Sequence, residues 1–231
     1  MADTVIDTHE VFKTYDEHAV PVHAVNGVHL HIERGEFTAL VGPSGSGKTT
    51  VLNMIGGLDR PTSGKVIING VDLSRLNRSE LVEFRLVNIG FVFQSFNLIP
   101  VLSAQENIEF ILLLQKWKKK DREQRVSELL RQIGLTDKAD KRPSELSGGQ
   151  QQRVAVARAL ASKPQFVLAD EPTANLDSVS AGNLLDMMLK LNQEEQITFL
   201  FSTHDQRVID KARRVIRLED GKVVSDTRQH S

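Results

Sequence analysis

The chain has 231 residues and 40% hydrophobic content, enough for a substantial buried core in one domain or in a core with an inserted subdomain. Its formal net charge of −1 provides no overall field for polyanions, so nucleic acid is not expected as its main partner. The absence of cysteine excludes disulfides and thiol chemistry and suits a reducing compartment.

Membrane insertion is also disfavoured by the sequence. No apolar run approaches the roughly 18 residues of a membrane-spanning helix, and the polar start MADTVIDTHE is unlike a signal peptide. We therefore expect a cytoplasmic chain, or one held at the inner face of the cell membrane only through a partner.

The first part of the chain has a β-strand pattern. Turn signals at Asn26-Gly27 and Arg34-Gly35 separate three expected strands, over 5–15, 28–32 and 37–41. We expect these strands to form an antiparallel sheet that opens the fold.

The segment GPSGSGKT fits the pattern G-x-x-x-x-G-K-[ST] and lies between a strand and a helical pattern. Its glycines lack a Cβ, so backbone N–H groups can wrap closely around phosphate oxygens. Lys48 supplies positive charge to the β- and γ-phosphates, and the Thr49 hydroxyl suits a Mg²⁺ that bridges them. An ordinary glycine-rich turn is the alternative, which the flanking elements disfavour. The predicted nucleoside triphosphate site comprises Gly42, Pro43, Ser44, Gly45, Ser46, Gly47, Lys48, Thr49 and Thr50.

The middle of the chain changes from β to helical character. The expected elements are a helix over 49–55, strands over 65–69 and 89–93, and helices over 103–115 and 121–133. The two later helices are predicted to form an inserted subdomain. The basic stretch 116–120, which includes Trp117, could be a patch for a membrane surface or nucleic acid, but acidic residues follow closely and favour a solvated connection.

The last part of the chain alternates between helices and strands. The expected elements are helices over 147–161 and 178–193, strands over 166–169 and 198–202, and a closing hairpin over 214–219 and 222–225. Such alternation predicts a parallel sheet covered by helices.

Two carboxylates follow the apolar run Phe166–Ala169. A buried parallel strand delivers its last residues to the ligand edge of the sheet, which is the edge of the phosphate loop. Asp170 is therefore predicted to hold Mg²⁺, and Glu171 to polarise an attacking water. Two adjacent acids in a surface turn are the alternative, which the apolar strand before them disfavours.

The motif Leu146–Gln150 (LSGGQ) precedes a helix rich in Ala, Val and Arg. Ser147 can cap this helix, and Gly148 and Gly149 open its first turn to an anion. Taken alone, the motif fits an N-cap with a flexible turn equally well.

Together these motifs, with Gln94 and His204, resemble the ABC-type ATPases in order and spacing over nearly the whole chain. The resemblance implies an α/β fold with a P-loop NTPase core, an N-terminal antiparallel β subdomain and an inserted helical subdomain with the signature motif. The expected single domain has its nucleotide-binding core in 1–94 and 162–231 and its helical subdomain in 95–161. The resemblance also implies a head-to-tail dimer that holds two ATP molecules, each between one copy's phosphate loop and the other's signature helix.

Site residues carried over from this resemblance have the following roles. Tyr15 resembles the aromatic that stacks on adenine, although a lone strand tyrosine is often a core or edge residue. Glu171 resembles the general base, and His204 the switch histidine at the γ-phosphate. Gln94 senses Mg²⁺ and the attacking water. The remaining nucleotide contacts come from Ser147, Gly148, Gly149, Gln150 and, across the dimer, Asp177.

Two motifs differ from the sequences that are usual in this family. Ala174–Asp177 stands where Ser-Ala-Leu-Asp is usual, and Gln151-Gln152 replaces a charged residue after the signature. Neither departure touches the chemistry, so a hydrolytically active site is expected.

Further sequence segments resemble those of the lipoprotein-release and macrolide-exporter subfamily. They are Gly56–Asp59 with Pro61–Gly64, Gly90–Pro100 and Leu168–Thr173. Members are ATPase subunits of bacterial membrane complexes that export, release lipoproteins or relay mechanical motion.

A transmembrane permease partner is implied as well, docking in a groove near Phe96, Leu98 and Ile99, although each of these could equally be a core residue. The alternatives left open are a soluble ABC protein of translation or DNA repair and an ATP-gated regulatory module. The former usually has two nucleotide domains or a long coiled coil, which this chain is too short to hold.

Overall fold

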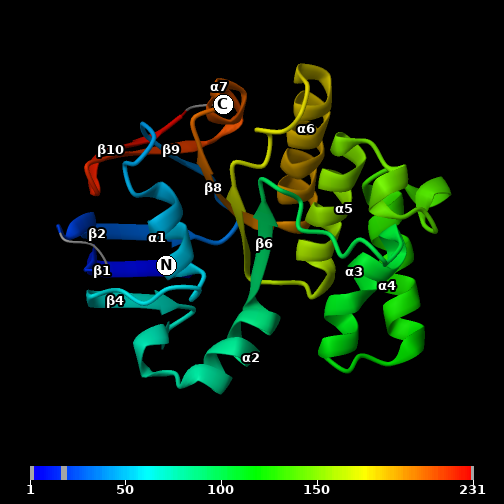
Figure 1. Cartoon of the computed structure of the whole chain (residues 1–231), viewed down its shortest axis with the longest axis horizontal. Coiled ribbons are helices and arrows are strands. Elements are labelled where there is room, and N and C mark those ends of the chain that lie inside the picture. The colour runs from blue at the N-terminus through cyan, green and yellow to red at the C-terminus, as the bar shows by residue number, and fades with distance from the viewer. Residues whose placement is uncertain (1–2, 17–19, 230–231) are drawn as a thin grey trace.

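The computed structural model describes residues 3–16 and 20–229 as two sheets with helices around them (Figure 1). A four-stranded antiparallel sheet has the order β2-β1-β4-β5. Its strands are β1 (Thr4–Tyr15), β2 (Val22–Glu33), β4 (Ser63–Ile68) and β5 (Val71–Asp72). The expected turn at Asn26-Gly27 is wrong: β2 runs through it, with a register shift and Gly27 at φ 75°. This is a bulge, which glycine accommodates because it lacks a Cβ.

The second sheet has six strands in the order β10-β9-β3-β8-β7-β6. Its strands are β3 (Phe37–Val41), β6 (Ile89–Phe93), β7 (Phe166–Asp170), β8 (Thr198–Thr203), β9 (Arg214–Glu219) and β10 (Lys222–Arg228). Neighbouring strands are parallel except for the β9–β10 hairpin. The placement of 37–41 in the antiparallel sheet is therefore wrong. Phe37–Val41 is almost wholly buried and apolar, as a central parallel strand is.

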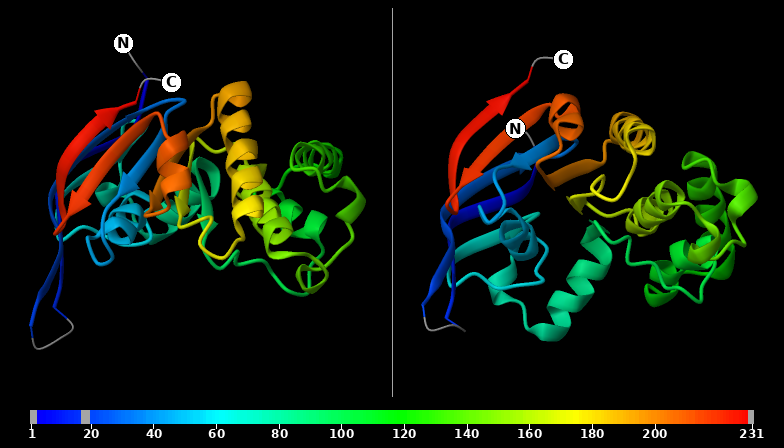
Figure 2. Two further views of the ribbon diagram at one scale, coloured as in Figure 1. Left: turned by 90° about the horizontal axis from the view of Figure 1, so that it is seen from above. Right: turned by 45° about the horizontal axis from the view of Figure 1, so that its top comes forward.

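Seven helices lie in the part of the chain that the structure describes. They are α1 (Lys48–Ile55), α2 (Arg78–Asn88), α3 (Ala104–Leu114), α4 (Lys119–Gln132), α5 (Gly148–Ala161), α6 (Ser178–Glu195) and α7 (Gln206–Lys211). Short 3₁₀ turns span η1 (Leu73–Arg75), η2 (Thr136–Lys138) and η3 (Pro143–Glu145). Figure 2 shows α3 and α4 projecting to the side of the molecule away from the antiparallel strands.

Two helices of the structure, α2 and α7, were not predicted from the sequence. Only Leu81 of α2 is buried, so this helix lacks the apolar stripe that reveals a helix in a sequence. Its one signal is a capping box between Asn77 and Glu80. Helix α7 is short, with Val208 as its buried residue. The expected connection at 116–120 is confirmed in part, because Trp117 packs against the core and the helix already begins at Lys119.

The buried side chains form two clusters. One joins α3, α4 and α5 to β7, β8 and α6, and the other joins the antiparallel sheet to α1. Successive residues along β7 and β8 belong to opposite clusters: the pair Val167 and Phe199 faces the first, and the pair Leu168 and Leu200 the second. This alternation confirms the predicted parallel sheet covered on both faces.

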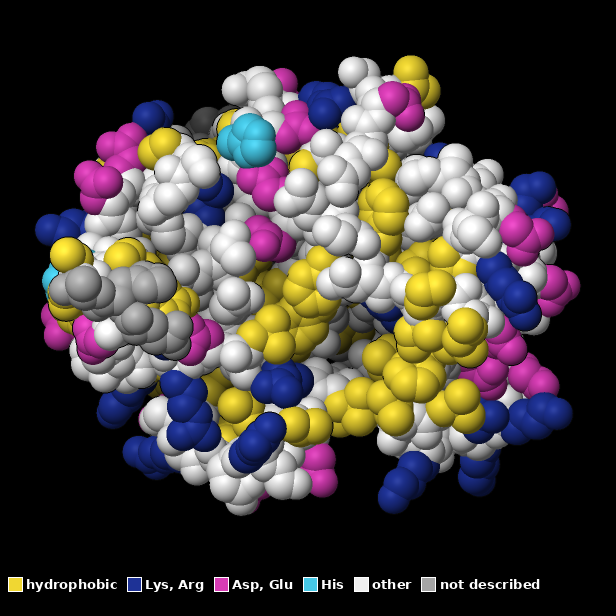
Figure 3. Space-filling model, viewed as in Figure 1, with side chains coloured by type: hydrophobic (Ala, Val, Ile, Leu, Met, Phe, Trp, Pro, Cys, Tyr) yellow, Lys and Arg dark blue, Asp and Glu magenta, His cyan; other side chains and the backbone are white. Residues whose placement is uncertain are grey.

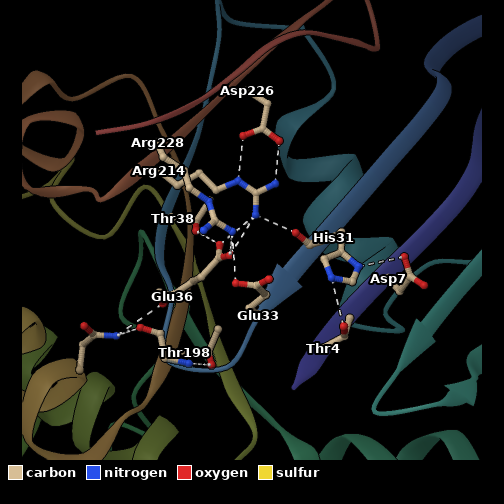
Figure 4. A network of polar contacts seen from close by, with 12 residues as sticks. Thr4, Asp7, His31, Glu33, Glu36, Thr38, Thr198, Arg214, Asp226 and Arg228 are labelled. Carbon is tan, nitrogen blue, oxygen red and sulfur yellow. Dashed lines mark hydrogen bonds and ion pairs between the residues drawn. The ribbon is translucent and has the colours of Figure 1, made fainter. Parts of the chain in front are cut away.

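An arginine on β9 ties the two sheets together (Figure 4). Arg214 donates through Nη1 to the His31 carbonyl oxygen of β2 at 2.7 Å and to both carboxylate oxygens of Glu36 at 3.0 Å. Its Nε and Nη2 donate to the two oxygens of Asp226 at 2.8 and 2.6 Å. Hydrogen bonding to Asp226, against the cost of burial, raises the pKa of Arg214 above its ordinary value. The contact keeps the antiparallel sheet in place beside the strands that carry the site.

Candidate active site

The phosphate loop connects the end of β3 to the start of α1. Gly47 is the N-cap of α1 at φ 99°, and a Cβ there would lie 2.3 Å from the Ala24 carbonyl oxygen. A Cβ on Gly42 would lie 2.1 Å from the Leu218 carbonyl oxygen. Only glycine fits at these two points, where the loop passes against the backbone of β2 and β9.

Two polar groups in the loop could serve an anion. Lys48 is 8% exposed, and its ammonium donates to the carbonyl oxygens of Gly42 and Pro43, both at 2.9 Å. The buried Ser46 hydroxyl has no hydrogen-bond partner within residues 3–16 and 20–229. A buried cation and an orphaned hydroxyl at a helix N-terminus fit a bound phosphate chain.

Oxygen ligands for Mg²⁺ meet beside this loop. The Thr49 hydroxyl on α1 lies 3.1 and 3.2 Å from the two carboxylate oxygens of Asp170 at the end of β7. Gln94 follows β6, whose Phe93 pairs with Asp170, so its side chain reaches the same edge. Hydroxyl, amide and carboxylate oxygens are the ligands that Mg²⁺ takes together with phosphate oxygens. When bound, the ion would neutralise charge on the β- and γ-phosphates.

Glu171 has a backbone conformation that few side chains adopt. Its φ is 46°, and its N–H donates to the Ser202 carbonyl oxygen at 2.9 Å. The carboxylate is held at both oxygens: Oε1 lies 2.7 Å from Nδ1 of His204, and Oε2 accepts from the Thr203 hydroxyl at 3.2 Å. Left-handed backbone in a non-glycine residue is common at functional sites.

Most of these groups line one cleft of about 650 Å³, whereas Gly42, Ser46 and Asp170 are not among its lining residues. The predicted residues that line it are Pro43, Ser44, Gly45, Gly47, Lys48, Thr49, Thr50, Gln94, Glu171 and His204. The cleft also includes Val22, His23 and Ala24 of β2, which the sequence prediction missed. They carry no motif, and only the packing of the antiparallel sheet brings them there.

Tyr15 lies at the end of β1, paired with Val22, and is not itself among the residues that line the cleft. Its hydroxyl donates to Asp59 at 2.8 Å, and the Lys13 ammonium lies 4.7 Å from its ring centre. Burial of Asp59 is outweighed by hydrogen bonds from Lys13 and Tyr15, so the pKa of Asp59 is lowered. The stacking of Tyr15 on adenine stays a prediction.

The signature motif is not among the residues that line this cleft. Ser147 caps α5 through a capping box with Gln150. The Gly148 and Gly149 amides in the first turn therefore have no acceptor within the helix. The site of a Cβ on Gly148 lies 3.7 Å from the Phe96 ring, and that on Gly149 lies 3.0 Å from Ser180. Thus the chain presents one phosphate cradle and a separate second helix N-terminus.

Asp177 caps α6 next to the signature helix. Its carboxylate accepts from the Val179 and Ser180 amides at 3.0 and 2.9 Å, and hydrogen bonding to Ser180 lowers its pKa. Asn175 in the same loop donates to the Gln94 carbonyl oxygen at 3.0 Å. The loop after Glu171 therefore touches both the Gln94 segment and the start of α5.

Comparison with known proteins agrees with these features. A family model described as ABC transporter matches residues 25–174. The chain is 40% identical over 223 residues to the lipoprotein-releasing system ATP-binding protein LolD of Legionella pneumophila, covering 96% of this chain and 98% of LolD. It is 45% identical over 217 residues to the macrolide export ATP-binding/permease protein MacB of Rhodopirellula baltica, covering 93% of this chain but 31% of MacB.

A solved structure gives the same result. The dimeric, post-hydrolysis state of the ATP-binding cassette MJ0796 bound to ADP and Pi has a TM-score of 0.89 and 42% identity, covering 98% of this chain and 99% of that one. In residues 3–16 and 20–229 we find no helix with the length and hydropathy of a membrane span. The resemblance, the fold class and the use of ATP with Mg²⁺ are thereby confirmed. The chain belongs to the ABC transporter family, as one of its ATP-binding and ATP-hydrolysing cassettes.

Proposed function

We propose that this chain powers a bacterial membrane transport complex by ATP-driven closure of a head-to-tail dimer. The observation that carries the proposal is the separation of its two anion-binding helix N-termini. One, at Gly47, lies inside the cleft with Lys48, while the other, at Ser147, caps a helix outside it. A second copy in the opposite orientation would bring its own signature helix to the open side of each cleft.

Within each cleft the residues of this chain have distinct roles. Lys48 leaves the two loop carbonyls and binds the β- and γ-phosphates. Glu171 accepts a proton from the attacking water, which bonds to the γ-phosphorus as the bond to the ADP oxygen breaks. His204 and Thr203 hold the Glu171 carboxylate in position. Closure on ATP and reopening after phosphate release would turn binding energy into movement of a partner.

Shared sites can be tested by mixing two inactive variants. Lys48→Ala disables the phosphate loop, and the bulky Ser147→Arg blocks the signature helix. In a mixed dimer one composite site contains both defects and the other contains none. We expect the mixture to regain ATP hydrolysis above the sum of its separate parts. The Lys48→Ala/Ser147→Arg double variant mixed with unmodified chain should show no such gain, because every mixed site is then defective.

Two results of that experiment would contradict the shared-site arrangement. The first is a mixture of the single variants no more active than its separate parts, and the second is an equal gain over the separate parts in both mixtures. Glu171→Gln tests the chemistry separately. It should retain ATP-dependent dimerisation and lose phosphate release, whereas unchanged release would exclude Glu171 as the base and unchanged function without release would favour a regulatory module.

We further propose that the permease partner docks in an apolar groove of about 380 Å³. Figure 3 shows hydrophobic side chains gathered on this face. The groove is lined by Val82 and Leu86 of α2, Phe91 and Phe93 of β6, and Phe110 and Ile111 of α3. Of the expected segment only Asn97 lines it, since Phe96 lies against the start of α5 and Leu98 packs against the core. The segment thus borders the groove, and the three predicted side chains do not form its lining.

A half-buried arginine connects this groove to the Gln94 segment of the nucleotide cleft. Arg158 of α5 lines the groove and donates to the carbonyl oxygens of Phe96 and Asn97 at 3.0 and 2.5 Å. Both residues have positive φ, 59° and 51°, so these contacts hold an unusual backbone two residues after Gln94. Pressure from a helix in the groove would be transmitted through this segment to Gln94.

The docking proposal predicts a loss of partner binding without loss of the ATP site. Val82→Asp, at a residue 47% exposed, should reduce co-purification of the membrane subunit from detergent extract. Val224→Asp, on β10 and 52% exposed, is the matched control, because it lines neither the groove nor the cleft. Relatives named for lipoprotein release and macrolide export support a complex of that type at the inner face of the cell membrane. Recovery of ribosomes or DNA in place of a membrane protein would overturn the transport role.

A further inference from the structure

A second polar depression lies away from the nucleotide cleft. Its volume is about 460 Å³, and four segments meet there: helix α4, the α5–β7 connection, the α6–β8 turn and the β2–β3 turn. Gln165 and Ile197, which line it, directly precede β7 and β8. It therefore lies at the amino ends of the parallel strands, whereas the ATP cleft lies at their carboxyl ends.

Cationic side chains predominate in this depression. Arg34, Arg125, Arg131 and Lys163 line it, against two carboxylates, Glu128 and Glu195. Arg34 is partly committed, since it donates to Asp3 at 2.7 Å and Gln165 at 2.8 Å. The side chains of Arg131 and Lys163 make no hydrogen bond or ion pair with any residue in 3–16 or 20–229. Both are exposed, so their charge is available to a ligand.

Arg125 is the least satisfied group of the depression. Its side chain is 7% exposed, and its Nη2 donates to the Leu160 carbonyl oxygen at 2.9 Å. Nη1 is 3.8 Å from a Glu128 oxygen, which is too long for a hydrogen bond, and Nε has no partner in the described chain. Burial lowers the pKa of Arg125, although Glu195 and Glu128 oppose this effect. A buried guanidinium with one weak ion pair is costly unless an anion completes its contacts.

We propose that this depression binds a small phosphate-bearing anion, which bridges helix α4 to the nucleotide-binding core. Planar guanidinium groups pair with phosphate oxygens through two hydrogen bonds at once, and a phosphomonoester carries a charge of about −1.5 to −2 at neutral pH. Arg125 and Arg131 would hold it from α4, and Lys163 from the α5–β7 connection. Because α4 and the core both contact the anion, its binding would stabilise their present arrangement.

The test uses the full chain with its nucleotide cleft filled by a non-hydrolysable ATP analogue and Mg²⁺. Inorganic phosphate is titrated at constant ionic strength, and the Nε–Hε signals of ¹⁵N-labelled arginine are followed by NMR, with Arg125→Lys used for assignment. We expect saturable shifts of Arg125 and Arg131. Arg131→Glu, at an exposed position that should not affect folding, should weaken phosphate binding at least tenfold. Arg75→Glu is the control, since Arg75 is 80% exposed and lies outside the depression.

Each other outcome would overturn the proposal. Shifts that rise linearly with phosphate, or that sodium chloride reproduces, would show only an ionic-strength effect. Shifts confined to arginines elsewhere would place the phosphate at another site. Acetate that binds as tightly as phosphate would show that the depression does not select the phosphate group. If Arg131→Glu and Arg75→Glu weakened phosphate binding equally, the depression would not be the binding site.

Discussion

Asp205 joins two loops that border the active-site cleft, and its charge should stabilise the fold measurably. Its carboxylate accepts from Arg207 Nη2 at 2.7 Å and from the Thr173 hydroxyl at 2.6 Å. The side chain is 14% exposed. Hydrogen bonding to Arg207, followed by that from Thr173, outweighs burial and lowers the pKa of Asp205 from 3.8 to about 2. Asp205→Asn keeps the shape of the side chain and removes its charge.

The size of the effect follows from that pKa. A shift from 3.8 to about 2 corresponds to about 2 kcal/mol of folding free energy at neutral pH, at about 1.4 kcal/mol for each pKa unit. Because the folded-state pKa of Asp205 is below the unfolded value, the stabilisation is present above about pH 4. It is lost as the pH falls from about 4 towards about 2.

Urea unfolding monitored by the fluorescence of Trp117, the only tryptophan, measures this difference. At neutral pH, Asp205→Asn should lower the free energy of unfolding by about 2 kcal/mol. The same substitution at exposed Asp210 of α7 should change it by less than about 0.5 kcal/mol. If Asp205→Asn lowered the free energy of unfolding no more than the Asp210→Asn control, the reasoning would be refuted. A difference from the unmodified chain that does not shrink between about pH 4 and pH 3 would refute it as well.

Three other substitutions test single contacts. Thr203→Val removes the hydroxyl that donates to Glu171, so kcat should fall about tenfold with KM unchanged, and Thr203→Ser should restore it in a steady-state phosphate-release assay. Gly90→Ala places a Cβ 2.6 Å from the Ala159 carbonyl oxygen, so the free energy of unfolding should fall by about 1 to 3 kcal/mol; unchanged urea stability would show that α5 moves freely. Asn77→Ala breaks the cap of α2 and should cost about 1 kcal/mol, whereas Asn77→Asp should retain most of the stability in the same assay.

Much of the fold was readable because local patterns and burial agreed. The apolar runs at 89–93, 166–169 and 198–202 were predicted as strands, and all three are strands of the parallel sheet. Strand 37–41 shows the limit of this approach. Its composition indicated a strand, but its neighbours β8 and β9 are about 160 residues or more away in sequence, so no local pattern identified its sheet. Helix α2 was missed because almost none of it is buried.

The motifs alone indicate the chemistry, since phosphate binding requires backbone that only glycine permits, and the strand-end Asp170 and Glu171 stand directly after an apolar run. The surroundings of these groups come from the folding of distant segments onto one another. This folding brought β2 to the cleft, fixed both oxygens of Glu171 with Thr203 and His204, and placed Arg125 in a second depression. Such contacts join residues far apart in the chain. They depend on how helices and sheets pack, which spacing within a motif does not encode.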